Sequence, residues 1–101
     1  MPTRAERSPR ARREFLAAAR WIAQDSPSAA RGWRAAVLDA GGLLGEHPLA
    51  GSVRPELGTT SLRFLTLQRF PYVLAYNPEA QPPLIVRILH AAPDLPTALA
   101  E

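Results

Sequence analysis

The sequence contains no cysteine, which excludes disulfide bonds and thiolate-bound metal ions. Its two histidines, His47 and His90, are too far apart in the chain to indicate a metal site by themselves. No apolar run approaches the roughly 20 residues that a membrane-spanning helix requires. No apolar segment follows the charged residues 1–15, as one would in a secretory signal. We therefore expect a cytoplasmic protein without a metal or other cofactor and without a membrane partner.

Lysine is absent too, so all twelve basic residues are arginines, and nine acidic residues leave a formal net charge of +3. This balance favours an anionic partner, either nucleic acid or an acidic protein segment. The use of arginine alone has two explanations. Bidentate contacts with phosphate or carboxylate would select arginine. A GC-rich coding sequence would also enrich arginine, together with alanine, glycine and proline, and we favour this explanation for the composition as a whole.

The remaining composition is that of a folded protein. The chain has 101 residues, of which 47% are hydrophobic and 21% are charged, and these proportions are ordinary for a globular domain. We predict a single domain over residues 1–101. It divides into a helical part at about 8–46, a sheet at about 61–90 and a short tail at 91–101, in which residues 94–101 suit one helical turn.

Two Ser-Pro pairs predict the starts of two helices. Ser8 and Ser26 are suitable N-caps, and Pro9 and Pro27 suit the first helical position. Apolar residues follow each pair at helical spacing. They are Ala11, Phe15, Ala18, Ala19 and Ile22 in the first helix and Ala30, Trp33, Val37, Ala40 and Leu44 in the second. The link between the helices is so short that they must form an antiparallel hairpin. Trp21 lies at the margin of the first stripe, where we expect it to cover an edge of the core.

Three segments are strand-like: residues 61–67, 72–77 and 84–90, which are rich in β-branched, leucine and aromatic residues. The connectors between them allow only hairpins, so the three strands form an antiparallel meander. Proline, glycine and threonine mark residues 48–60 as a loop. Residues 3–7 are either a short edge strand or an unstructured arm. The fold class is thus α+β, with the helical hairpin packed on a small twisted, mostly antiparallel sheet of three or four strands.

Alternation along the strands assigns their side chains to two faces. The side chains expected under the helices are those of Leu62, Phe64, Val86 and Ile88. The side chains expected on the opposite face are those of Arg63, Leu65, Ile85, Arg87 and Leu89. A shift of one residue in register would reverse this assignment.

The corner between the first two strands reads Arg-Phe-Pro-Tyr at residues 69–72. We predict a tight turn fixed by Pro71, with Arg69 and Tyr72 on the rim of the sheet. This rim is either a plain turn or a cationic and aromatic surface on which a partner docks.

Several strings, taken in order, resemble the RelE/ParE superfamily of bacterial type II toxin–antitoxin toxins. They are SPRARREF, ARWIAQDSPSAARGW, HPLAGSVRPEL, RFPYVLAYN and LIVRILHAAPDLP, and the match covers roughly residues 6–97. Within the superfamily the chain is more similar to the ParE branch. The resemblance implies a helical hairpin on a twisted, mostly antiparallel sheet. It also implies a cognate antitoxin that wraps the toxin and holds it inactive in a hetero-oligomer.

The superfamily implies two activities. RelE-like members are ribosome-dependent mRNA endonucleases, whereas ParE-like members inhibit DNA gyrase without chemistry of their own. The nuclease scheme uses basic residues on the sheet and a tyrosine near the C-terminus. The residues that could replace this set here are Arg63, Arg87, His90 and Tyr72, but lysines and a C-terminal tyrosine are missing. ParE-like sequences often carry an arginine where this chain has Pro93, which argues against a target contact at that position.

The resemblance therefore favours a ParE-like inhibitor that binds its target, with DNA gyrase as that target. A RelE-like mRNA interferase acting on ribosome-bound mRNA, or a degenerate, non-toxic antitoxin-binding homologue, are the alternatives. The candidates for contact with a target or partner are Arg63, Arg69, Tyr72, Arg87, His90 and Asp94. Each has a structural alternative: Arg87 suits an ion pair with Glu56 or Asp94 equally well, and Tyr72 suits sheet packing with a polar tip.

Overall fold

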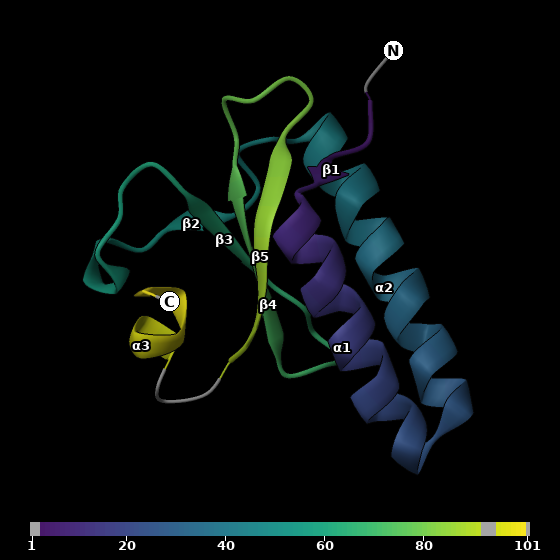
Figure 1. The fold of residues 1–101 in the computed structure, drawn as a ribbon. Coiled ribbons are helices and arrows are strands. Elements are labelled where there is room, and N and C mark those ends of the chain that lie inside the picture. The colour runs from purple at the N-terminus through teal and green to yellow at the C-terminus, as the bar shows by residue number, and fades with distance from the viewer. Residues whose placement is uncertain (1–2, 92–94, 101) are drawn as a thin grey trace.

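The computed structural model describes residues 3–91 and 95–100, and its architecture is α+β, as predicted (Figure 1). The elements in chain order are β1 (Glu6–Arg7), α1 (Pro9–Asp25), α2 (Pro27–Glu46), β2 (Ser52–Val53), the 3₁₀ turn η1 (Pro55–Leu57), β3 (Arg63–Thr66), β4 (Tyr72–Asn77), β5 (Leu84–His90) and α3 (Leu95–Ala100). Within the described ranges, no helix has the length and apolarity needed to cross a bilayer.

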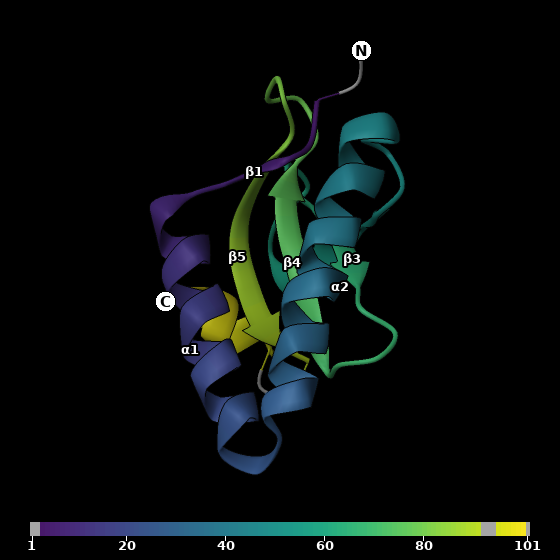
Figure 2. The ribbon, with the colours of Figure 1, turned by 90° about the vertical axis from the view of Figure 1, so that its right-hand side faces the viewer.

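Both Ser-Pro pairs start helices, as predicted. The hydroxyl of Ser8 accepts a hydrogen bond from the backbone N–H of Ala11 at 3.1 Å. The hydroxyl of Ser26 accepts one from Ala29 at 3.2 Å. Ser26 is also the C-cap of α1, so a single residue separates the two helices. They run antiparallel, side by side, in front of the sheet in Figure 2.

The sheet has five strands in the order β1-β5-β4-β3-β2. The predicted meander forms its centre, because β4 pairs antiparallel with both β3 and β5. The prediction of three or four strands was too low. The two outer strands, β1 and β2, have only two residues each and are therefore hard to recognise in the sequence. β1 pairs in parallel with β5, which decides the alternative left open for residues 3–7. β2 lies inside residues 48–60, which were predicted as loop.

Helices cover both faces of this sheet. The hairpin lies on one face, and η1 and α3 lie on the other (Figure 1). The buried residues on the hairpin side include Trp33, Val37, Leu44, Leu74, Tyr76 and Ile85. Those on the α3 side are Leu57, Phe64, Val73, Ala75, Leu89 and Leu95. The C-terminal helix α3 therefore closes a second, smaller core.

The predicted faces were wrong for β3 and for the start of β5. Leu62, Phe64 and Val86 pack on the α3 side, whereas Leu65 and Ile85 pack on the hairpin side. For β3 the error is a shift of one residue, which moves every side chain to the other face.

The end of β5 follows the prediction, with Ile88 on the hairpin side and Leu89 on the α3 side. A β-bulge explains why the predicted faces are right for only part of β5. Ala75 of β4 pairs with Arg87, but the next residue of β4 pairs with Ile85, so Val86 is the extra residue. The bulge shifts the alternation by one position, and no single phase describes β5.

Candidate functional site

Arg63 lies on the hairpin side of the sheet and not on the opposite face as predicted, because its neighbour Phe64 packs on the α3 side. The Arg63 guanidinium donates hydrogen bonds from Nη1 to the carbonyl of Gly51 at 2.8 Å and to that of Leu49 at 3.5 Å. Arg63 therefore fixes the segment that leads from α2 into β2.

Tyr76, which pairs with Arg63 across the β3–β4 ladder, holds the same segment from inside the core. Its hydroxyl accepts a hydrogen bond from the N–H of Gly51 at 2.8 Å and donates one to the carbonyl of Pro48 at 2.8 Å. A Cβ atom on Gly51 would lie 2.7 Å from the Tyr76 ring, so this close approach requires glycine. Together the two side chains order the start of the predicted loop.

We expect Tyr76→Phe to lower the free energy of unfolding by about 1–3 kcal/mol, because the Gly51 N–H and the Pro48 carbonyl both lose a buried partner. Tyr72→Phe is the matched control, since the Tyr72 hydroxyl has no hydrogen-bond partner among the described residues, and it should cost no more than about 0.5 kcal/mol. Denaturant unfolding of both variants measures the difference. Equal losses in the two variants would contradict the role given to the Tyr76 hydroxyl.

Arg87 is buried, with 8% of its surface exposed, and its partner is Glu14 of α1. Its Nε lies 3.1 and 3.2 Å from the two carboxylate oxygens, and its Nη2 lies 3.0 Å from Oε2. The pairing with Glu56 suggested by the sequence is wrong, because Glu56 pairs with Arg54 at 3.0 Å. Asp94, the other suggested partner, lies outside the described residues.

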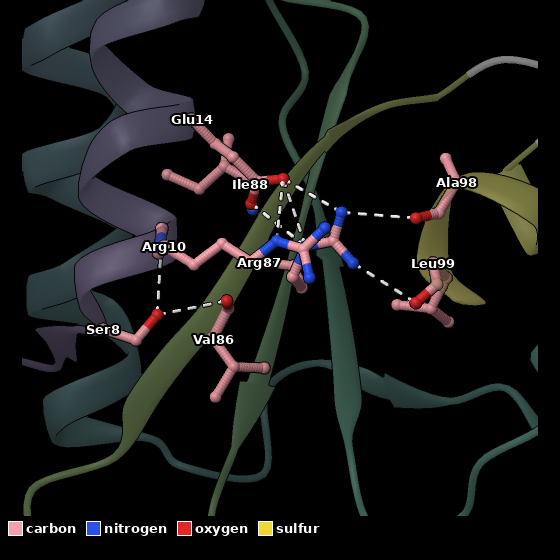
Figure 3. Close-up of polar contacts among 9 residues, drawn as sticks. Ser8, Arg10, Glu14, Val86, Arg87, Ile88, Ala98 and Leu99 are labelled. Carbon is pink, nitrogen blue, oxygen red and sulfur yellow. Dashed lines mark hydrogen bonds and ion pairs between the residues drawn. The ribbon is translucent and has the colours of Figure 1, made fainter. Parts of the chain in front are cut away.

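The same guanidinium holds the last turn of α3 (Figure 3). Its Nη1 and Nη2 donate hydrogen bonds to the carbonyls of Leu99 and Ala98, each at 3.2 Å. Because α3 ends at Ala100, these carbonyls lack partners within the helix, and a cation suits them. One buried arginine thus connects α1, β5 and α3.

Glu14 also binds the edge of β5 along the part of the strand that does not pair with β1. β1 pairs with β5 at Leu84 and Ile85. Further along, Glu14 Oε1 accepts a hydrogen bond from the N–H of Ile88 at 2.9 Å, and the Ser8 hydroxyl donates one to the carbonyl of Val86 at 3.1 Å. These side chains satisfy backbone groups that would otherwise be open to pairing with another strand.

Tyr72 and His90 come together at the end of the β4–β5 ladder. They are direct partners in the register, and their ring centroids lie 5.2 Å apart in an edge-to-face arrangement. Tyr72 also packs on Trp33 of α2, with centroids 4.7 Å apart, and Phe70 packs on the same indole at 5.4 Å. The corner at residues 69–72 is therefore anchored on α2 by two aromatic side chains.

Two adjoining hollows lie beside the Tyr72–His90 pair, and both are lined by Trp21, Tyr72 and His90. We name them together the Trp21 groove. Its apolar walls include Ala17, Ala18, Ile22, Phe70, Pro71 and Leu89. Trp21 does not cover the core as predicted, because 68% of its surface is exposed. An exposed tryptophan in an apolar groove is typical of a surface that contacts another protein.

Three residues of the nuclease alternative, Tyr72, Arg87 and His90, line one hollow, and Arg63 does not line it. Arg63 and Arg87 lie on the two strands that flank β4, and each binds groups of the fold. Burial raises the pKa of the Tyr72 hydroxyl. Of the three residues in the hollow, Arg87 is held by Glu14 and α3, and Tyr72 and His90 form a ring pair.

The other candidates add little chemistry to this pair. Arg69 is exposed on the loop before β4, and it has no hydrogen-bond or ionic partner in the described part of the chain. Pro93 and Asp94 lie outside the described residues. Among the residues described, no group of three or more histidines and carboxylates is placed to hold a metal ion.

Sequence reasoning missed Glu14 and the exposure of Trp21. A signal for Glu14 was present, because it lies three residues after Ala11 and four before Ala18, both of which are buried. A carboxylate beside the apolar stripe of a helix needs a buried partner. For Trp21 the sequence carries no comparable signal, because its position at the margin of the stripe fits either a buried or an exposed ring.

Two comparisons with known proteins bear on this fold and site. The family described as ParE toxin of type II toxin-antitoxin system, parDE, matches residues 5–95. A chain of the chromosomal ParDE TA system from P. aeruginosa has a similar structure, with a TM-score of 0.72 and 18% sequence identity, over 90% of this chain and 98% of that chain. At this identity the likeness shows the fold alone. None of the curated proteins matches the chain.

Proposed function

Because the chain belongs to the ParE toxin family of type II toxin–antitoxin systems, we propose that it inhibits DNA gyrase by protein binding and that a cognate antitoxin neutralises it. The observation that carries the proposal is the structural use of its two central arginines. Arg63 and Arg87 both bind groups within the fold, whereas a metal-independent nuclease needs free cations to stabilise the phosphorane. Gyrase as a target places the protein in the cytoplasm.

The Trp21 groove is the surface that we assign to the target. Its three shared residues combine one exposed indole with the Tyr72–His90 pair. Tryptophan and tyrosine are the residues that most often dominate the binding energy of protein interfaces. Arg69, on the loop next to Tyr72, adds an exposed cation at the margin of this surface.

The antitoxin is proposed to bind at the other edge of the sheet. β2 is the last strand in the sheet order, it is two residues long, and 40% of Val53 is exposed. The shortness of β2 limits pairing at this edge, but β2 pairs on one side only, and an open edge can accept an added strand from a partner. The net charge of +3 favours an acidic antitoxin segment, which would fold on binding and form a toxin–antitoxin hetero-oligomer.

A RelE-like mRNA interferase is the second candidate, because Tyr72 and His90 are in ring contact and Arg69 is exposed nearby in the chain. This candidate lacks a second free cation in the same place. It also requires Tyr72 to act with a pKa that burial has raised.

Two assays on the purified protein separate the candidates. We expect the protein to inhibit supercoiling by DNA gyrase and to leave mRNA uncut in the presence of ribosomes. The antitoxin encoded beside it should restore supercoiling when added in equal amount. Codon-positioned cleavage of mRNA that disappears in His90→Ala would overturn the gyrase proposal. No effect in either assay, with antitoxin binding retained, would identify a degenerate toxin.

A further inference from the structure

A set of arginines on the hairpin has no part in the site or the fold. Arg13 and Arg20 of α1 and Arg31 and Arg34 of α2 are exposed. None of the four has a hydrogen-bond, ionic or ring partner among the described residues. We name these four residues the arginine face.

The helical geometry places most of this set on the side away from the sheet. Arg13 and Arg20 each follow a buried alanine of α1 by two positions, which is about 200° around the helix. Arg31 precedes the buried Trp33 by two positions, so it too lies about 200° around its helix, α2, from a buried residue. Arg34 follows Trp33 directly and lies on the flank of α2. In Figure 2 this outer side of the hairpin faces the viewer.

The arginines also lie near one another along the hairpin. Arg20 is six residues before Ser26 and Arg31 is five residues after it, so the antiparallel helices bring these two positions to the same level. Arg13 and Arg20 are separated by two helical turns, or about 10 Å along the axis. The hairpin is therefore a rigid support for several cations at fixed spacing.

The acidic groups of the hairpin balance this charge only in part. The hairpin, residues 9–46, contains six arginines and four acidic residues, Glu14, Asp25, Asp39 and Glu46. Glu14 is bound to Arg87, and the other three are exposed, with Asp25 at the tip of the hairpin and Asp39 and Glu46 in the second half of α2. An unbalanced cationic surface of this kind attracts a polyanion.

We propose that the arginine face binds the phosphate backbone of a nucleic-acid duplex without reading its sequence. Guanidinium groups match phosphate in a bidentate geometry, and backbone contacts position a protein without conferring specificity. A single strand is held by stacking of successive bases on several aromatic rings. Among the described residues near this face only Trp21, next to Arg20, is an exposed ring, so a duplex is favoured. An acidic protein is disfavoured because the face lacks an apolar pocket; Leu16 is a single exposed leucine there.

Fluorescence anisotropy with a short DNA duplex of arbitrary sequence tests the proposal. We expect weak binding whose log K falls with log salt concentration at a slope of about −3 to −4, because each neutralised phosphate contributes about −0.9. Arg20→Gln should reduce the magnitude of the slope by about 1, and replacing all four arginines with glutamine should bring it near zero. Arg54→Gln is the control of equal charge, since Arg54 lies outside the hairpin and pairs with Glu56.

An RNA duplex is the second probe, and it shows whether the arginine face prefers the phosphate backbone of DNA or of RNA. Binding of either duplex with this slope supports the proposal. The proposal is overturned if no salt-dependent binding occurs, or if Arg54→Gln lowers the slope as much as Arg20→Gln does. Polyglutamate that binds as tightly as the duplex would also overturn it in favour of an acidic protein partner. The assay contains no gyrase, so its outcome is independent of the proposed target.

Discussion

Glu14→Ala is expected to lower the free energy of unfolding by about 3–5 kcal/mol, because it leaves the Arg87 guanidinium buried without its carboxylate. The change also removes the acceptor for the Ile88 N–H at the edge of β5. Arg87 holds the carbonyls of Leu99 and Ala98, so the docking of α3 on the sheet should weaken as well. Denaturant unfolding measures the loss, and protection of α3 amides from hydrogen exchange reports on its docking.

Glu46→Ala is the matched control, since Glu46 is an exposed glutamate on α2 and its replacement should change stability by no more than about 0.5 kcal/mol. A double variant, Glu14→Leu with Arg87→Met, tests the electrostatic cause. Replacing both partners by apolar groups removes the unpaired charge, so this variant should be more stable than Glu14→Ala alone. A loss below about 1 kcal/mol in Glu14→Ala would show that the ion pair does not hold the three elements together.

The helical hairpin was predictable because all of its signals are local. The caps at Ser8 and Ser26, the prolines after them and the apolar spacing act within a few residues. The strands β3, β4 and β5 were found for the same reason. β1 was only one of two alternatives for residues 3–7, and β2 was not predicted, because two-residue strands exist only through partners that lie outside the local sequence.

The faces of the sheet could not be read from alternation alone. The extra residue Val86 changes the phase within β5, and no glycine or proline in that strand marks the bulge. The candidate site has the same limitation. Arg63 and Arg87 were predicted as residues of target contact or catalysis. Their partners in the fold are 12 and 73 residues away, so only the folded chain shows these contacts.

The roles of the arginines explain where the functional surface lies. Two of them are bound inside the protein, at Gly51 and at Glu14, and cannot meet a target without breaking those contacts. The cations that stay exposed include the arginine face of the hairpin and Arg69. Between them the Trp21 groove offers apolar and aromatic surface, so target binding and polyanion binding are assigned to separate parts of the hairpin.

Trp21→Ala is expected to lower the affinity for the target by at least about 30-fold, which corresponds to the 2 kcal/mol or more of an interface hot spot. Because 68% of Trp21 is exposed, its removal should change the free energy of unfolding by less than about 1 kcal/mol. Toxicity in a growth assay should fall accordingly. Titration of purified gyrase with each variant gives the affinity, and a denaturant melt verifies that the fold is intact.

Leu49→Ala is the matched control for this experiment, because Leu49 is a large apolar side chain with nearly the same exposure, 67%. It follows α2, on the segment bound by Arg63, and does not line the Trp21 groove. Loss of general surface hydrophobicity would affect both variants alike, whereas a specific contact would affect Trp21→Ala alone. Full toxicity and unchanged gyrase affinity in Trp21→Ala, with reduced toxicity in Leu49→Ala, would move the target surface to the β2 edge of the sheet, where target and antitoxin would then compete directly.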